Sequence, residues 1–145
     1  MTKIYKTELK SLLIPVPVGV SLMLCLMTFR LERNFAEYVI WYRQDNDIIL
    51  KSIVNGGFTP IILLSNYTVD QTMGGVSVLE ETIKQRSAEK INCVISTTSC
   101  SLPREPDDIG SISKVCSEYN VPHIIVNDHG LQSRKIMKNI QDAHE

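Results

Sequence analysis

The sequence lacks an excess of charge of either sign. Its 145 residues carry 15 basic and 16 acidic side chains, which gives a formal net charge of -1. Nucleic-acid-binding domains usually have a basic surplus, so any contact with RNA would have to be local. The sequence also lacks a Gly-x-Gly-x-x-Gly or Walker-type loop, which disfavours a stand-alone nucleotide-binding domain. With 43% hydrophobic residues, the chain can form one domain with a core of its own.

Paired cysteine motifs are also missing. The four cysteines, Cys25, Cys93, Cys100 and Cys116, show no Cys-x-x-Cys spacing and lie in or beside apolar segments. We therefore expect buried free thiols rather than disulfides or a zinc site, and we predict no bound metal. Free thiols favour a reducing compartment, which indicates the cytosol.

Ser11–Phe29 contains no charged residue and is long enough to suggest a membrane span or a signal anchor. Pro15, Pro17 and Gly19 interrupt this run. They leave a helical piece from about Val20 to Arg30, roughly eleven residues or ~16 Å long, against a hydrocarbon layer of ~30 Å. We therefore expect a buried loop and helix here, without membrane contact.

Short apolar runs alternate with amphipathic segments along the rest of the chain. The apolar runs predict strands at Tyr38–Trp41, Thr59–Leu64, Asn92–Ser96 and Val121–Val126. Helical spacing predicts helices at Val20–Arg30, Asp45–Asn55, Val76–Lys90, Asp107–Tyr119 and Leu131–Ala143. Wholly apolar strands between amphipathic helices are typical of a parallel sheet covered on both faces. The predicted fold class is therefore α/β, with a mostly parallel sheet and helices on both faces.

Ligands of such sheets collect beyond the carboxyl ends of the strands, and two early segments are unusual there. The segment Pro15–Ser21 contains a glycine and leads into a helix, so its free N–H groups could bind a phosphate. That signal is weak because Pro17 has no N–H group. The segment Tyr42–Asn46 is a polar cluster that opens a helix, although Asp45 alone could be an ordinary N-cap.

Two later segments are also polar where a strand should end. Thr97, Thr98 and Ser99 follow the third predicted strand, where their hydroxyl groups could merely satisfy loop backbone. The segment Asn127–Gly130, with Asp128 and His129, follows the last strand and could be a plain turn.

Together these four segments match the ordered parts of a pyridoxal phosphate site in an aminotransferase-like fold. In this interpretation the cofactor phosphate lies at the helix start that carries Gly19 and Ser21. Asn46, Thr98 and Ser99 offer further polar contacts, with a hydroxyl group reaching the ring oxygen. Asn127 or Asp128 would address the ring nitrogen, and His129 would lie close by.

Five stretches resemble the O-phosphoseryl-tRNA(Sec) selenium transferase family, also called Sep-tRNA:Sec-tRNA synthases, from about Leu13 onward. They are Ile14–Arg30, Tyr38–Asp45, Leu50–Ile62, Ile95–Asp107 and Tyr119–Lys135. The order ISTTSC, Pro103-Arg104, VPHI, VN and GLQS is specific to this family. The resemblance implies a pyridoxal phosphate enzyme that makes selenocysteinyl-tRNA(Sec) from O-phosphoseryl-tRNA(Sec) and selenophosphate. It also implies a cytoplasmic homotetramer of the fold-type I class.

Members of this family are roughly three times as long as this chain. We therefore expect 1–145 to be the middle of the large cofactor domain, with residues 1–13 unassigned. The resemblance puts the Schiff-base lysine beyond Glu145, so we predict no catalytic residue within the chain and no activity for the chain alone.

The departures from the family pattern leave an alternative open. Pro17-Val18-Gly19 stands where the family prefers Ala-Thr-Gly, and Asp128-His129 stands where it has Ala-Tyr. The chain could thus be a non-catalytic relative, or an incomplete gene product that acts at most as an interaction module. We also expect an open sheet edge and uncovered apolar helix faces around Leu22, Leu24 and Leu26, and hence self-association.

Overall fold

The computed structural model describes residues 13–42, 47–63, 71–99, 106–128 and 130–143, without the side chains of residues 71–74 and 99. Its strands are β1 (Tyr38–Tyr42), β2 (Thr59–Leu63), β3 (Ile91–Ser99) and β4 (His123–Asn127). They form one sheet in the order β2-β1-β3-β4, and every neighbouring pair is parallel. The predicted strands and the parallel sheet are confirmed. Runs of β-branched and aromatic residues suit such strands, which are buried on both faces.

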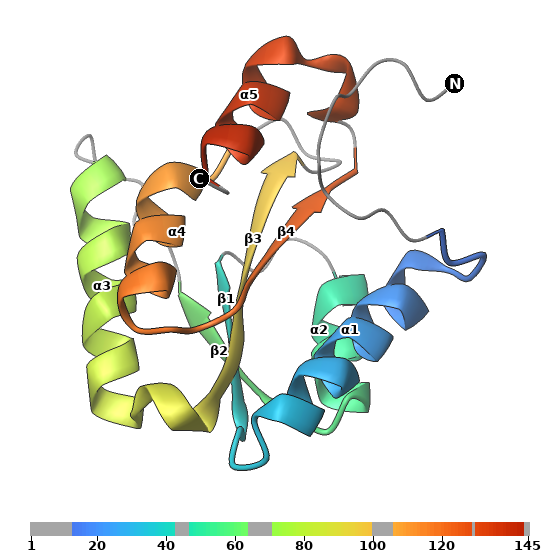
Figure 1. Ribbon diagram of the computed structural model, residues 1–145, viewed down its shortest axis with the longest axis vertical. Helices are drawn as coiled ribbons and strands as arrows, with labels where there is room; N and C mark the ends of the chain where they lie inside the picture. Colours follow the sequence, from blue (N-terminus) through green and yellow to red (C-terminus); the bar gives the residue numbers. More distant parts are fainter. Residues whose placement is uncertain (1–12, 43–46, 64–70, 100–105, 129, 144–145) are drawn as a thin grey trace.

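The helices occupy the segments with helical spacing. They are α1 (Val18–Glu32), α2 (Asp47–Asn55), α3 (Gln71–Arg86), α4 (Ile109–Glu118) and α5 (Arg134–Asp142), with the 3-10 helices η1 (Ala88–Lys90) and η2 (Gly130–Gln132). In Figure 1, α1 and α2 cover one face of the sheet, α3 and α4 cover the other, and α5 lies near the carboxyl ends of β3 and β4. Of these helices, none combines the length and the apolar character needed to cross a membrane.

The helix α4 begins later than predicted. Its N-cap is Asp108, whose side chain accepts hydrogen bonds from Ser111 N (3.2 Å) and Ser111 Oγ (2.7 Å). Such a cap satisfies a free N–H group of the first turn. The predicted helix began at Asp107, but in the structure Asp107 precedes the N-cap and lies outside the helix. The predicted cap Asp45 lies outside the described residues.

The strand β3 is longer than predicted, and the interpretation of Thr97 to Ser99 as loop residues is wrong. The apolar pattern stops at Ser96, but pairing with β4 continues as far as Ser99 opposite Asn127. The pairing of β3 with β1 ends at Ile95 opposite Trp41. β3 and β4 thus extend together beyond the register with β1.

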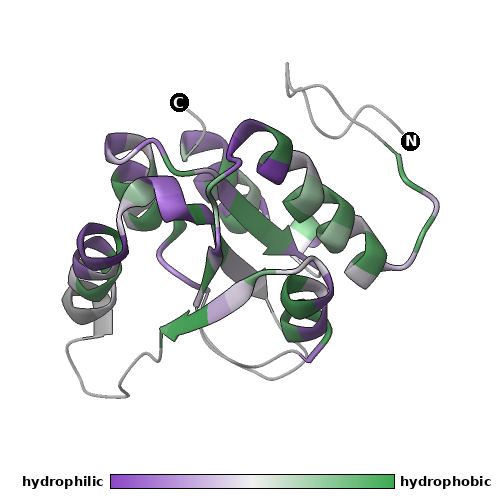
Figure 2. Cartoon of the chain, turned by 90° about the horizontal axis from the view of Figure 1, so that it is seen from below, coloured by the Kyte–Doolittle hydropathy of each residue, from purple (hydrophilic) through white to green (hydrophobic). Residues whose placement is uncertain are grey.

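Two apolar clusters hold the layers together, one on each face of the sheet. On the α3/α4 face the buried residues include Ile40, Leu79, Ile83, Val94 and Ile112. On the α1/α2 face they include Leu26, Trp41, Ile49, Ile53 and Ile95. Figure 2 shows hydrophobic residues along the strands and on the helices that cover them. Neighbouring residues of a strand alternate between the two clusters, as Ile40 and Trp41 do.

The helix α1 is apolar on both of its sides. Leu22 is 7% exposed and Leu26 is fully buried, so the prediction that they are uncovered is wrong. They pack into the cluster that α1 forms with α2 and the sheet. Leu24 points outward and is 40% exposed, as predicted, and Met27 is also exposed.

The cysteine prediction holds for part of the chain. Cys93 and Cys116 are buried free thiols, and burial raises the pKa of Cys116 to about 12. Cys25 is a free thiol but lies on the exposed side of α1, so its predicted burial is wrong. Cys100 lies outside the described residues.

At the amino end of the sheet, Arg33 joins three segments that are distant in sequence. Its guanidinium group donates to the carbonyl oxygens of Ile91 (2.9 Å), Asn120 (3.0 Å) and Ala88 (2.5 Å). These carbonyls belong to the start of β3, the turn after α4 and the start of η1. The fixed fork of the guanidinium group makes such multiple contacts possible.

His123, the first residue of β4, is held between two serine hydroxyl groups. Its Nε2 lies 2.7 Å from Ser96 Oγ, and its Nδ1 lies 2.8 Å from Ser113 Oγ. A neutral imidazole donates through one nitrogen and accepts through the other, which fits a hydroxyl group on each side. Burial lowers the pKa of His123 to about 4.

Candidate functional site

The carboxyl ends of β3 and β4 bring two of the predicted site residues together. Thr98 is buried, and its Oγ1 donates to Oδ1 of the partly buried Asn127 at 2.5 Å. Asn127 Nδ2 donates to Met137 Sδ of α5 at 3.6 Å. Sulfur is a weak acceptor, so this contact uses little of the donor capacity of the amide. The pair thus forms a neutral, oriented amide at the end of two parallel strands.

Gly130 leaves the space that Asn127 occupies. A Cβ atom on Gly130 would lie 2.1 Å from Asn127 Oδ1 and 2.8 Å from Ile136 Cγ2. Both contacts are closer than packed atoms tolerate, so a larger residue at 130 would have to displace the Asn127 or the Ile136 side chain. The sequence pattern suggested a turn at Gly130, and the structure adds this steric reason.

Asp107 was not predicted as a site residue, although it contacts the end of β3 directly. It is 6% exposed, and its Oδ2 accepts hydrogen bonds from Thr97 N (2.8 Å) and Thr97 Oγ1 (3.3 Å). Its own N–H group donates to Thr97 O at 3.1 Å. The only sequence signal was an acid shortly before a helix, which is also the signal of an N-cap.

Tyr42 ends β1 at the same edge of the sheet. Its hydroxyl group donates to Gly75 O of α3 at 2.6 Å. Burial raises the pKa of Tyr42 well above its usual value, and the nearby carboxylate of Asp107 adds to this effect. Tyr42 therefore remains a neutral hydroxyl group at physiological pH.

Gly19 and Ser21 lie in the first turn of α1, on the α1/α2 side of the sheet. Pro17 is the N-cap and provides no side-chain hydrogen bond, and the first turn contains no acidic residue. Gly19 packs closely on α2, since a Cβ atom there would lie 3.0 Å from Ile48 Cγ2. Its carbonyl oxygen also accepts from Ser52 Oγ at 2.9 Å. The structure thus gives Gly19 a role in helix packing that sequence reasoning missed.

The remaining predicted site residues are placed less fully. Asp128 follows β4 directly and is exposed. Ser99 pairs with Asn127 in the sheet, but its side chain lies outside the described part of the structure. Asn46 and His129 also fall in segments that are not described.

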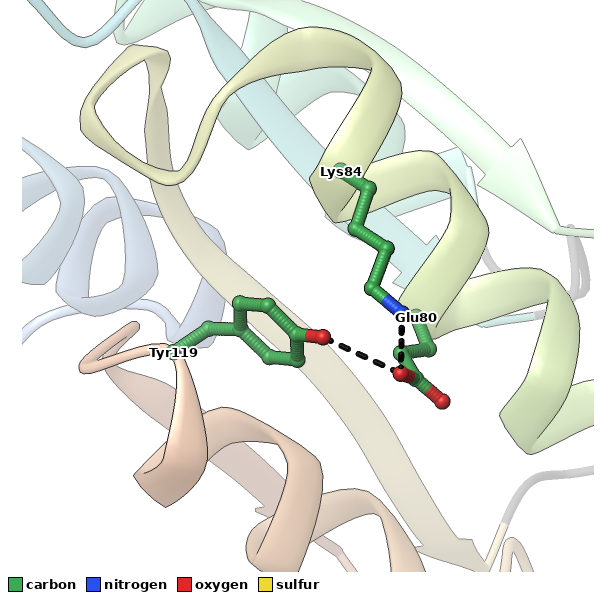
Figure 3. Close-up of polar contacts among 3 residues, drawn as sticks. All are labelled: Glu80, Lys84 and Tyr119. Atoms are coloured by element: carbon green, nitrogen blue, oxygen red, sulfur yellow. Dashed lines mark hydrogen bonds and ion pairs between the residues drawn. The ribbon is translucent and has the colours of Figure 1, made fainter.

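Two of the described lysines form ion pairs away from this edge. Lys84 Nζ lies 2.5 Å from Glu80 Oε1 on α3, and Tyr119 OH donates to the same oxygen at 3.0 Å (Figure 3). Lys84 lowers the pKa of Glu80 through this hydrogen bond. Lys90 lies 3.7 Å from Glu37 near the amino ends of the strands. Such exposed pairs are surface contacts between solvated groups.

Comparison with models of protein families identifies one family. Residues 5–145 match the model of the family described as O-phosphoseryl-tRNA(Sec) selenium transferase, SepSecS. This chain belongs to that family. Among curated members, the protein of Caenorhabditis elegans is 41% identical over 134 residues, which cover 92% of this chain and 28% of that protein. The protein of Dictyostelium discoideum is 41% identical over 133 residues, covering 91% of this chain and 28% of that protein.

Solved structures confirm the fold-type I class. An archaeal O-phosphoseryl-tRNA(Sec) selenium transferase superposes with a TM-score of 0.78 at 27% identity, covering 89% of this chain and 30% of that chain. Oryza sativa TDC with PLP and tryptamine superposes with a TM-score of 0.72 at 12% identity, covering 87% of this chain and 31% of the other. The second likeness concerns the fold alone. The chain thus spans less than a third of the length of these family members.

Proposed function

We propose that this chain is part of a pyridoxal phosphate-dependent transferase that forms selenocysteinyl-tRNA(Sec) from O-phosphoseryl-tRNA(Sec) and selenophosphate. The carrying observation is the Thr98–Asn127 pair at the carboxyl ends of β3 and β4, in a chain matched to the selenium transferase family over residues 5–145. Open parallel sheets bind their ligands at this edge.

The residues at this edge fit the proposed cofactor. The first turn of α1 has no acidic residue and no side-chain cap, so the N–H groups of Val18 and Gly19 suit a phosphate dianion. Thr98 and Asn127 are neutral polar groups of the kind that fix the orientation of a ring substituent. When bound, pyridoxal phosphate supplies an electron sink for a carbanion on the substrate.

Each predicted residue has a proposed role in binding. Gly19 and Ser21 hold the phosphate at the start of α1, and Asn46 and Ser99 add polar contacts. Asn127 contacts the polar edge of the ring, with Asp128 and His129 beside it. The lysine that binds the cofactor covalently is expected in the part of the family that this chain does not match. We therefore propose that the chain binds but does not catalyse alone.

The partners follow from the same proposal. The complete enzyme would bind tRNA(Sec) and selenophosphate, work as a homotetramer in the cytoplasm, and make no membrane contact. The exposed apolar side of α1, which includes Leu24 and Met27, is consistent with self-association of the chain.

A second candidate function is a non-catalytic interaction module. The close packing of Gly19 on Ile48 and Ser52 favours it, because that packing explains the glycine without any phosphate. The two candidates differ in one property: the interaction module does not bind the cofactor, even when the missing parts of the family sequence are supplied.

Titration calorimetry with pyridoxal 5'-phosphate tests the proposal. We expect saturable binding, and weaker binding of pyridoxal, which lacks the phosphate. The substitution Thr98→Val removes the hydroxyl group at nearly constant shape and should weaken binding about fivefold, since one hydrogen bond contributes about 1 kcal/mol. Thr82→Val is the matched control, because Thr82 Oγ1 only donates to Val78 O within the exposed part of α3. Absence of saturable binding, or equal effects of both variants, would overturn the proposal.

A further inference from the structure

We propose that Asp107 is a positioning residue of this site, because it binds the backbone of Thr97 in the manner of a neighbouring strand. The inference rests on the proposed function for the identity of the ligand, but its structural basis does not. Asp107 would act through Thr97 and Thr98 on Asn127, without touching the ligand itself.

The direction of the backbone groups in β3 supports this role. Val94 N donates to Pro122 O at 2.9 Å, so Val94 points its backbone groups toward β4. In a strand within a parallel sheet, alternate residues bond to opposite neighbours. Ile95 and Thr97 therefore point toward the β1 side, where the described register ends at Ile95.

At Thr97 the hydrogen bonds run to Asp107. The carboxylate accepts from Thr97 N at 2.8 Å, and the N–H group of Asp107 donates to Thr97 O at 3.1 Å. One residue thus satisfies both the donor and the acceptor of Thr97, as a paired strand would. The additional contact from Thr97 Oγ1 to the same carboxylate oxygen, at 3.3 Å, orients the side chain as well.

Thr97, which Asp107 holds, is directly bonded to a residue of the candidate site. Thr98 follows Thr97 directly, and its hydroxyl group donates to Asn127 Oδ1 at 2.5 Å. Thr97 is only 3% exposed, so its N–H group would lose a partner without gaining bulk water if Asp107 were removed. Loss of this hydrogen bond would favour a shift of the end of β3. That movement would change the orientation of the Asn127 amide.

The neighbouring residue provides a matched control. Asp108 is also a carboxylate, but it is exposed and caps α4 through Ser111. Asp108→Ala removes the same charge one residue away and weakens a helix cap, while the contacts of Thr97 remain. If the loss of affinity came from the missing charge or from lower stability of the fold, it would appear in both Asp107→Ala and Asp108→Ala.

The first measurement is the affinity for pyridoxal 5'-phosphate by titration calorimetry with the 145-residue chain. We expect Asp107→Ala to weaken binding about tenfold or more, since hydrogen bonds to a charged group are strong. Asp107→Asn keeps one acceptor oxygen and should have an intermediate effect. Asp108→Ala should change the affinity less than about twofold. Equal losses in Asp107→Ala and Asp108→Ala would overturn the positioning role.

The second measurement needs no cofactor and separates the two proposals. Nuclear magnetic resonance reports the side-chain amide signals of Asn127 and the hydrogen exchange of the Thr97 amide. Asp107→Ala should shift the former and accelerate the latter, whereas Asp108→Ala should leave both unchanged. If the wild-type chain binds no cofactor, the proposed function fails and these signals alone decide the role of Asp107. If Asp107→Ala does not fold, Asp107→Asn takes its place, and unchanged signals there would overturn the inference.

Discussion

The two ends of the sheet use polar residues in opposite ways. At the amino end, Arg33 binds main-chain carbonyl oxygens from three segments. At the start of β4, level with the middle of β1, His123 is enclosed by two serines. At the carboxyl end, Thr98 and Asn127 bind each other, and the acceptor of Asn127 Nδ2 among the described residues is a sulfur at 3.6 Å. The first arrangement satisfies strong groups with the protein itself. The second joins neutral polar groups to each other at the edge where open parallel sheets bind their ligands.

From this comparison we expect the largest loss of stability on substitution at Gly130, at the carboxyl end of the sheet. Gly130→Ala places a Cβ atom 2.1 Å from Asn127 Oδ1, so the side chain or the backbone must shift. We expect a loss of about 3 kcal/mol in unfolding free energy, together with loss of the Thr98–Asn127 bond. Urea denaturation followed by circular dichroism measures the first effect.

The control for this variant is Gly110→Ala. A Cβ atom there would meet only Asp108 Oδ1, at 3.9 Å, and Gly110 lies within α4. Alanine should therefore be neutral or stabilise the chain by up to about 1 kcal/mol. If the two alanine variants have equal stability, the steric account of Gly130 is wrong.

At the start of β4, His123 makes stability depend on pH. Its pKa is lowered to about 4, against 6.5 for a solvated histidine, so the unfolded chain binds a proton more readily than the native chain. Stability should be constant above about pH 6.5, fall as pH decreases toward 4, and lose about 3 kcal/mol over that interval. Urea denaturation between pH 4 and 7.5 measures the effect. His123→Gln should remove this slope, and an unchanged slope in that variant would contradict the assignment.

Loss of Arg33 should affect stability but not ligand binding. Arg33→Ala removes one donor from each of three carbonyl oxygens, and we expect a loss of about 2 kcal/mol. Arg86→Ala is the control at the same end of the sheet, because Arg86 is exposed and its described contact is the stacking on Tyr38 at 5.1 Å. Its cost should be about 0.5 kcal/mol. A fall in cofactor affinity in Arg33→Ala, measured by calorimetry, would contradict the division between the two ends.

The smallest effect is expected at Gly19. Gly19→Ala brings a Cβ atom within 3.0 Å of Ile48 Cγ2, which should cost less than about 1 kcal/mol if α2 adjusts. The N–H group remains, so the affinity for pyridoxal 5'-phosphate should not change. Gly75→Ala, with its nearest contact at 3.5 Å, is the control for the stability measurement. A tenfold loss of affinity in Gly19→Ala would mean that the phosphate approaches this carbon closely.

The fold could be predicted from the sequence because its signals are local. The apolar runs of β1 and β2 and the spacing of Ile109, Ile112 and Val115 in α4 indicate both the elements and the faces that they bury. The parallel direction of the strands was inferred from the alternation of strands and helices along the chain. These features depend on residues a few positions apart, which a single sequence records directly.

The parts that were missed depend on contacts between distant segments. Thr97 to Ser99 carry no apolar pattern, and they are part of β3 because β4 pairs with them. Leu22 and Leu26 are covered by α2 and the sheet, which no helical pattern in α1 reveals, since α1 is apolar on both sides. The role of Asp107 was hidden for the same reason. Its partner, Thr97, lies ten residues earlier and belongs to another element.

The central position of Trp41 gives the molecule a built-in optical probe. It is the only tryptophan of the chain, it lies in the middle of the sheet, and none of its surface is exposed to solvent. Unfolding transfers its indole ring from a hydrocarbon environment to water, so the fluorescence emission should move to longer wavelength in a single step when the core separates. Changes confined to the surface of the molecule should leave the emission wavelength unchanged.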